Sequence, residues 1–126
     1  MPQKILVVED DNATRVLYVA ILAGAGFDAI AVSRLKTAMQ AITEELPDAV
    51  VADVRLASEQ MLENGLQLAA LNPRSIPIVM VSGYPDPELE RQAHQLGAAY
   101  LLKPVSPTAL IDILRSKLAG EADRTH

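Results

Sequence analysis

The sequence contains no cysteine, so a disulfide framework, a thiolate nucleophile and a cysteine-ligated zinc or iron–sulfur site are all excluded. It also lacks a long uncharged stretch. The longest segment without Lys, Arg, Asp or Glu is the 12-residue run from Val16 to Phe27, well short of the roughly 20 residues that span a bilayer. The sequence therefore predicts neither a cross-linked scaffold nor a transmembrane helix.

Positive charge is scarce as well. The chain carries 11 Lys and Arg against 16 Asp and Glu, which gives a formal net charge of −5 at pH 7. Excess negative charge disfavours electrostatic binding to nucleic acid or to an anionic membrane. The N-terminal apolar run ends at Glu9, Asp10 and Asp11, which is unlike a secretory signal peptide. We therefore expect a cytoplasmic protein that contacts neither nucleic acid nor membrane directly.

A length of 126 residues, half of them apolar, predicts one compact domain, which we place at residues 1–120, followed by a polar tail at 121–126. Short runs of consecutive apolar residues predict strands that are covered on both faces, as in a parallel sheet between helical layers. These runs are residues 5–8, 49–52, 78–81 and 100–102, with a weaker candidate at 27–32.

Helical periodicity fills the intervals between the predicted strands. We expect Asn12, Ser33, Asp86 and Ser106 to cap helices that end near Ala23, Pro47, Gly97 and Ala119, and a short helix between Gly65 and Leu71. The order strand–helix, repeated five times, predicts an α/β fold with a doubly wound parallel sheet.

Polar side chains follow four of the predicted strands: Glu9 and Asp10, Asp53, Ser82, and Lys103. Carboxyl ends of parallel strands meet at one edge of the sheet, where such folds bind ligands. Crowded carboxylates repel one another unless a cation lies among them, and Mg²⁺ suits a cluster of oxygen ligands. The alternative is that two of the three acids are helix caps or surface residues.

A carboxylate, a divalent ion, a lysine and a hydroxyl form a set suited to phosphoryl transfer, where positioning and charge neutralisation are the main tasks. Asp53 follows the strand expected at the centre of the sheet, so we predict that it accepts the phosphoryl group. Glu9 and Asp10 are better suited to holding the metal.

Four segments, at residues 5–11, 47–53, 76–83 and 99–104, resemble the motifs of the receiver domain of two-component response regulators. The resemblance covers nearly the whole chain and is to the single-domain type found among chemotaxis regulators. It implies a flavodoxin-like, five-stranded parallel sheet of order 2-1-3-4-5 with five helices. It also implies a phosphoacceptor with intrinsic self-phosphorylation and autodephosphorylation chemistry, and not a turnover enzyme.

The resemblance implies that Asp53 takes a phosphoryl group from a sensor histidine kinase or a histidine phosphotransfer protein. Mg²⁺ would be bound by Asp10, Asp53 and the backbone carbonyl of Arg55, with Glu9 in contact directly or through water. Lys103 would bind one phosphoryl oxygen.

Ser82 would bind another phosphoryl oxygen, and Tyr100 would then change rotamer and reshape the surface formed by the fourth helix, fifth strand and fifth helix. The Lys103–Pro104 peptide bond is expected to be cis, as is usual in the family. That surface would bind a downstream effector or an output domain outside this sequence, and the chain would be a monomer or a weak homodimer through it.

The sequence departs from the family pattern in one loop. Gly65 comes twelve residues after Asp53 where eight or nine are usual, and the extended loop at 57–64 borders the predicted site. Two alternative functions remain: a docking module of receiver fold that is never phosphorylated, and an aspartyl-phosphate hydrolase. The hydrolase needs a second Asp where this chain has Arg55.

Overall fold

The computed structural model describes residues 2–54, 68–70, 75–83 and 85–124, with side chains up to residue 120. Five strands form one parallel sheet of order β2-β1-β3-β4-β5, which confirms the predicted fold. The strands are β1 (Lys4–Val8), β2 (Asp28–Val32), β3 (Ala49–Asp53), β4 (Ile78–Ser82) and β5 (Ala99–Leu102).

Burial explains the sequence pattern of each strand. The central strands β3 and β4 are buried at every position, and β1 at all but its first, so each reads as a run of consecutive apolar residues. The edge strand β2 is covered less and includes the exposed Asp28. This partial exposure is why its apolar signal in the sequence is the weakest.

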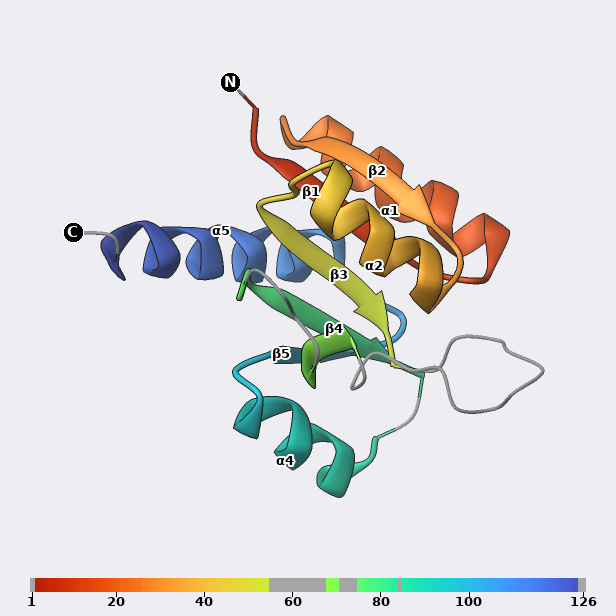
Figure 1. Cartoon of the computed structure of the whole chain (residues 1–126). Coiled ribbons are helices and arrows are strands. Elements are labelled where there is room, and N and C mark those ends of the chain that lie inside the picture. The colour runs from red at the N-terminus through yellow and green to blue at the C-terminus, as the bar shows by residue number, and fades with distance from the viewer. Residues whose placement is uncertain (1, 55–67, 71–74, 84, 125–126) are drawn as a thin grey trace.

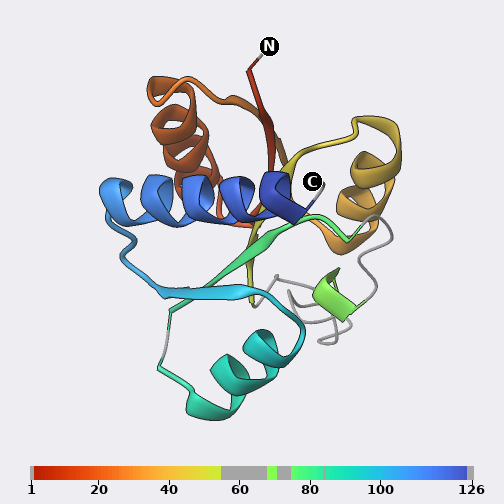
Figure 2. The same cartoon turned by 90° about the vertical axis from the view of Figure 1, so that its left-hand side faces the viewer.

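Helices cover both faces of the sheet (Figures 1 and 2). Helices α1 (Asn12–Gly24) and α5 (Pro107–Arg124) pack on one face, where Tyr18, Leu22, Leu110 and Leu114 complete a core with β1, β3 and β4. Helices α2 (Leu35–Glu44) and α4 (Pro87–Gln95), together with the helical residues 68–70, pack on the other. The rest of the helix predicted at 65–71 lies outside the described residues.

Two of the predicted N-caps are confirmed and two are wrong. Asp86 accepts from the Leu89 N–H at 3.1 Å, and Ser106 Oγ accepts from the Ala109 N–H at 3.4 Å. Helix α1, however, is capped by Asp11, whose carboxylate accepts from both the backbone N–H and the hydroxyl of Thr14. Helix α2 begins after Arg34, without a side-chain cap from Ser33 or any other residue.

Two helix ends also differ from the prediction. Helix α2 ends at Glu44, before Pro47, because Leu46 adopts a left-handed conformation with φ of 53° that cannot continue the helix. Helix α5 continues past Ala119 to Arg124, so residues 121–124, predicted as part of a polar tail, are helical in backbone. In the described part of the chain, no helix has the length and apolar character needed to cross a membrane.

Candidate functional site

Three predicted site residues lie together at the carboxyl edge of the sheet. Glu9 follows β1, Asp53 is the last residue of β3, and Lys103 follows β5. Each lies two residues beyond a member of the core under α1 and α5 (Val7, Val51 and Leu101). Because strand side chains alternate with a period of two, all three point toward the same face of the sheet.

Lys103 connects the two acids directly. Its Nζ donates to Asp53 Oδ2 at 2.9 Å and to Glu9 Oε2 at 3.0 Å. The Glu9 side chain is 1% exposed and that of Asp53 is 10% exposed, whereas that of Lys103 is 27% exposed. The ammonium therefore bridges two carboxylates that are almost removed from water, and is itself more exposed than either of them.

Burial controls the protonation of Glu9. It is the largest influence on the carboxyl and raises its pKa from 4.5 to about 7, against the lowering effect of hydrogen bonds from the Asp11 backbone N–H and Lys103. For Lys103, burial disfavours the charged form, but the hydrogen bonds to Asp53 and Glu9 outweigh it and raise the pKa of the ammonium above its ordinary value. Lys103 is therefore charged at neutral pH.

The acidic cluster also includes Asp10. One carboxylate oxygen from each of Glu9, Asp10 and Asp53 lies within 4.8 Å of the others, which is compact enough for a single cation to contact them. A donor set made only of carboxylate oxygens fits a hard divalent ion such as Mg²⁺. The predicted ligand from the Arg55 carbonyl lies outside the described residues.

Ser82 and Tyr100 lie on the other face of the sheet from the bridged acids. In the register of β4 and β5, Ser82 pairs with Leu102, and Met80 pairs with Tyr100. Ser82 is buried at the end of β4, and the half-buried Tyr100 packs against the core under α2 and α4. The Lys103 backbone N–H donates to the Ser82 carbonyl at 2.7 Å, which links these two strand ends.

The Lys103–Pro104 peptide bond is cis, as predicted. One supporting residue was missed by sequence reasoning. Arg15 donates from one guanidinium nitrogen to the Glu9 carbonyl at 2.8 Å and to the Asp10 carbonyl at 3.4 Å, and from the other to Asn12 Oδ1 at 2.6 Å. It thereby holds the turn that carries the acids. Its signal in the sequence is that it is the one charged residue between Asn12 and Phe27.

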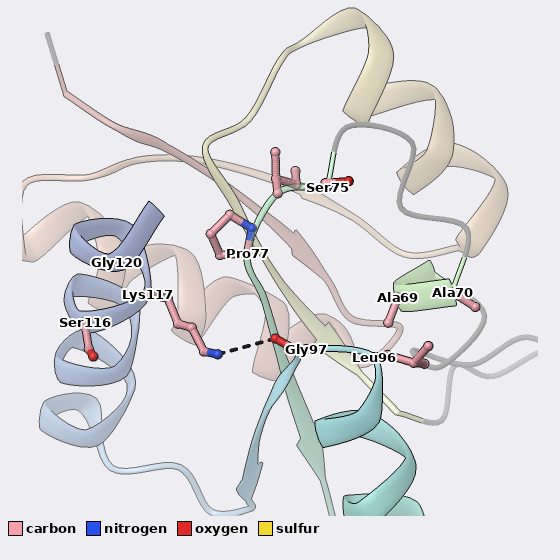
Figure 3. Close-up of a pocket in the computed structure, with 10 residues that line it drawn as sticks. Ala69, Ala70, Ser75, Pro77, Leu96, Gly97, Ser116, Lys117 and Gly120 are labelled. Atoms are coloured by element: carbon pink, nitrogen blue, oxygen red, sulfur yellow. Dashed lines mark hydrogen bonds between the residues drawn. The ribbon is translucent and has the colours of Figure 1, made fainter. Parts of the chain in front are cut away.

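A cavity of about 600 Å³ opens elsewhere, beside the residues that precede β4 and β5 (Figure 3). Lys117 of α5 reaches across it to donate to the Gly97 carbonyl at 3.4 Å. None of its described lining residues is acidic, and none is a predicted site residue. The chemistry expected from the sequence therefore belongs to the acidic cluster at the opposite edge of the sheet.

Comparison with known proteins places the chain in a family that has this fold. The family model of the response regulator receiver domain matches residues 5–115, and the chain belongs to this family. A CheY-like receiver domain protein from Methanospirillum hungatei JF-1 is 26% identical, with a TM-score of 0.88 over 98% of this chain and 99% of that one. The BeF₃-activated receiver domain of Klebsiella pneumoniae RstA is 29% identical, with a TM-score of 0.81 over 92% and 98% of the two chains.

The transcriptional regulatory protein ZraR of Escherichia coli K12 is 31% identical to this chain over 123 residues, which cover 97% of this chain and 27% of ZraR. The present chain thus spans about a quarter of the length of that relative. Family membership sets the class of the protein as a response regulator receiver domain, a class that generally binds Mg²⁺ and acts as a signalling phosphoacceptor.

Proposed function

We propose that this chain is a phosphorylation-controlled signalling domain in which Asp53 accepts a phosphoryl group from a phosphohistidine on a sensor kinase or a histidine phosphotransfer protein. The observation that carries this proposal is the position of the Asp53 carboxylate, held at 2.9 Å from Lys103 Nζ and beside Glu9 and Asp10. A nucleophilic oxygen, a fixed cation and two further carboxylates are the parts that phosphoryl transfer requires.

The transfer balances without a further reactant. A carboxylate oxygen of Asp53 forms a bond to phosphorus as the bond between phosphorus and the histidine nitrogen breaks, and that nitrogen leaves with the electron pair. Lys103 is placed to move from the carboxylate to a phosphoryl oxygen, where its charge offsets the added negative charge. Attack by water on phosphorus later returns Asp53 to a carboxylate.

Glu9, Asp10 and Asp53 are the described residues that would hold the metal, with Glu9 in contact directly or through water. When bound, Mg²⁺ would supply charge neutralisation between the acids and the phosphoryl oxygens. The Glu9 carboxylate accepts from the Asp11 N–H on one oxygen and from Lys103 on the other, so it is fixed in orientation. Arg15 holds the carbonyls of the same turn and positions Asp10.

Phosphorylation would act on the opposite face through Ser82 and Tyr100. Ser82 is joined to Lys103 through the backbone hydrogen bond between the ends of β4 and β5, so both residues respond to a group held at this edge. A hydroxyl that turns toward a phosphoryl oxygen leaves space for the Tyr100 ring, which packs against the core covered by α4. The surface of α4, β5 and α5 would change in this way.

The partners in this proposal are a phosphohistidine donor and a downstream protein, which is either a separate effector or an output domain outside the present sequence. A cytoplasmic location follows from the donor, because sensor kinases transfer the phosphoryl group there. The turnover-hydrolase alternative finds no support in the family that matches. The phosphorylation-independent docking module is an outcome of the test below.

The test is incubation of the protein with Mg²⁺ and acetyl phosphate, followed by intact-mass measurement. We expect wild type to gain the mass of one phosphoryl group and Asp53→Asn to gain none. Asp28→Asn, the same chemical change at an exposed residue of β2, is the matched control and should behave as wild type. Absence of a mass gain in wild type, with and without Mg²⁺, would identify a docking module instead.

Beryllofluoride provides a separate test of the conformational change, because the similar RstA receiver domain was obtained in a BeF₃-activated form. We expect the NMR signals of Tyr100 and of α4 to shift on addition of beryllofluoride and Mg²⁺ to wild type, and to stay unchanged in Asp53→Asn. Unchanged Tyr100 signals in a protein that does bind beryllofluoride would remove the tyrosine from the mechanism.

A further inference from the structure

Strand β2 has an unpaired edge. It stands at one end of the strand order, and no strand in the described part of the chain pairs with its outer side (Figure 1). The Asp28 N–H donates to the carbonyl of Gln3, directly before β1, at 2.9 Å. Because backbone groups alternate between the two sides of a strand, those of Ala29 and Ala31 point away from β1. Their N–H and C=O groups are therefore open to another strand.

This edge also lacks the usual protection against strand pairing. Soluble proteins protect an edge strand with charged side chains, proline or a bulge. The one charged residue of β2 is Asp28, at its start, and the pairing with β1 continues without a bulge from there to Val32. The side chains of Ala29 and Ala31 are too small to cover the backbone. An extended segment of another protein can therefore add to the sheet at this edge.

A groove of about 290 Å³ runs beside the β2 edge, on the face of the sheet that α2 covers. The apolar side chains of Ile30 and Val32 line it and pack against the core below α2. The exposed side chains of Thr37 and Gln40 line it from α2. A strand added beside β2 would direct every second side chain toward this groove.

One end of the groove is acidic. Glu44 and Glu45 line it where α2 ends, and both are exposed. Lys4, the register partner of Asp28, lies 3.6 Å from the Glu45 carboxylate, so Asp28 belongs to the same end. Glu44 forms no ion pair with any residue that the structure describes, and the carboxyl end of a helix adds partial negative charge. Three acids and one lysine at this end favour a cationic ligand.

We propose that the β2 edge and this groove bind an extended cationic segment of a partner protein, which joins the sheet as a further strand. Its backbone pairs with Ala29 and Ala31. On the groove side, the residue beside Glu44 is lysine or arginine, and the next two on that side are apolar and lie beside Ile30 and Val32. The recognised pattern is one cation and two apolar residues at alternate positions.

A second copy of the chain does not supply this pattern. The strands with a free edge in the described sheet are β2 and β5, and neither contains a lysine or an arginine to meet Glu44. Two chains of net charge −5 also repel each other, whereas a cationic segment is attracted. The charges of the groove therefore favour a different protein as the partner.

The β2 edge is separate from the surface proposed to respond to phosphorylation. Strands β2 and β5 stand at opposite ends of the strand order, and none of the described residues that line the groove belongs to the acidic cluster. A partner can therefore stay bound while Asp53 gains or loses a phosphoryl group. Tests in EDTA without a phosphodonor keep this proposal independent of the proposed function.

The first test is NMR titration of the full chain with acetyl-TKTVTVT-amide and with acetyl-TVTVTKT-amide, because the segment can run in either direction along β2. We expect at least one peptide to bind and to shift the signals of β2 and α2. Replacing its lysine by glutamate should weaken binding by at least about tenfold. A failure of both peptides to bind at millimolar concentration, or equal binding of the glutamate peptide, would overturn the proposal.

Charge reversal locates the cation. Glu44→Lys should weaken binding of the lysine peptide by at least about tenfold, and the glutamate peptide should bind this variant more tightly than it binds wild type. Glu90→Lys makes the same change in net charge at an exposed residue of α4 and is the matched control, with an expected loss below about twofold. Equal losses in the two variants would mean that the peptide responds to net charge alone, which contradicts the proposed groove.

Amide hydrogen exchange tests the added strand directly. The N–H groups of Ala29 and Ala31 should exchange rapidly in the free protein and at least about tenfold more slowly with saturating peptide. The Ile30 N–H faces β1, so its exchange should be slow in both states. A bound peptide that leaves Ala29 and Ala31 unchanged would refute strand addition. Protection that instead develops with rising protein concentration, without peptide, would identify a second copy as the occupant and overturn the proposal.

Discussion

Replacing Lys103 by Met tests whether the ammonium is what makes the acidic cluster compatible with folding. The side chains have similar length, but the variant leaves Glu9 and Asp53 facing each other without the cation that lies 3.0 and 2.9 Å from them. Removing one partner of a buried ion pair costs about 3–5 kcal/mol. Because the Lys103 side chain is 27% exposed and water relieves part of the loss, we expect about 2 kcal/mol.

The assays are urea unfolding and thermal unfolding, both followed by far-ultraviolet circular dichroism, with EDTA or with excess Mg²⁺. For 126 residues, about 2 kcal/mol corresponds to a fall in thermal midpoint of about 8 °C in EDTA. Mg²⁺ should reduce the difference between Lys103→Met and wild type to less than half, because the ion replaces the missing charge between the acids. The metal should also bind the variant more tightly, since it no longer competes with the ammonium.

The matched control is Lys4→Met. Lys4 pairs with Glu45 at 3.6 Å, and both side chains are substantially exposed, so we expect a loss below about 0.5 kcal/mol that does not depend on Mg²⁺. Two results would refute the reasoning: a Lys103→Met protein as stable as Lys4→Met in EDTA, or a stability difference that Mg²⁺ leaves unchanged. The first result would mean that the lysine does not hold the acids together, and the second that Mg²⁺ does not replace its charge between them.

Three further predictions follow from the same contacts. The raised pKa of Glu9 predicts that the metal-free protein loses up to about 3 kcal/mol of stability as pH rises from 4.5 to about 7, since the folded state holds this proton more tightly than the unfolded state. In Glu9→Gln the urea midpoint should not depend on pH over that range, and a pH dependence equal to that of wild type would contradict the assignment. Arg15→Met should weaken Mg²⁺ binding by about tenfold in calorimetry, because Arg15 holds the carbonyls of the turn that carries the acids. Arg91→Met, which removes an exposed ion pair on α4, is the control and should bind Mg²⁺ as wild type does. An Arg15→Met protein with wild-type affinity would show that the turn holds the acids without the arginine. Asp86→Ala should cost about 1 kcal/mol in urea unfolding because it removes a capping bond, and Ser33→Ala should cost almost nothing, so comparable losses would argue against the observed caps.

The amino-acid sequence by itself determined the sheet and the edge at which the site lies. Runs of consecutive apolar residues identify strands buried on both faces, and parallel strands bring their carboxyl ends together whatever their order. Glu9, Asp10, Asp53 and Lys103 therefore had to meet at one edge. The strand order came from the family resemblance, because local patterns carry no information about which strands are neighbours.

The tertiary structure decided which of two similar side chains caps α1. Asp11 and Asn12 are residue types of similar capping strength, and we predicted Asn12 as the cap of α1. In the structure Asn12 Oδ1 accepts a hydrogen bond from Arg15, whose guanidinium also donates to the Glu9 carbonyl. Because the Asn12 side chain is used in this way, Asp11 caps the helix. The bridge from Lys103 to Glu9 joins residues 94 positions apart, so no local pattern could predict it.

The outer face of α1 is another feature that the sequence could not predict and that only the tertiary structure decided. A helix that is apolar on all sides reads as buried, and the uncharged run from Val16 to Phe27 contains no signal that separates its inner face from its outer one. Only packing against the sheet decides that Tyr18 and Leu22 are buried while Val16 and Leu17 face outward. Burial depends on which neighbours the fold supplies, and α1 has the sheet and α5 on one side and none of the described chain on the other.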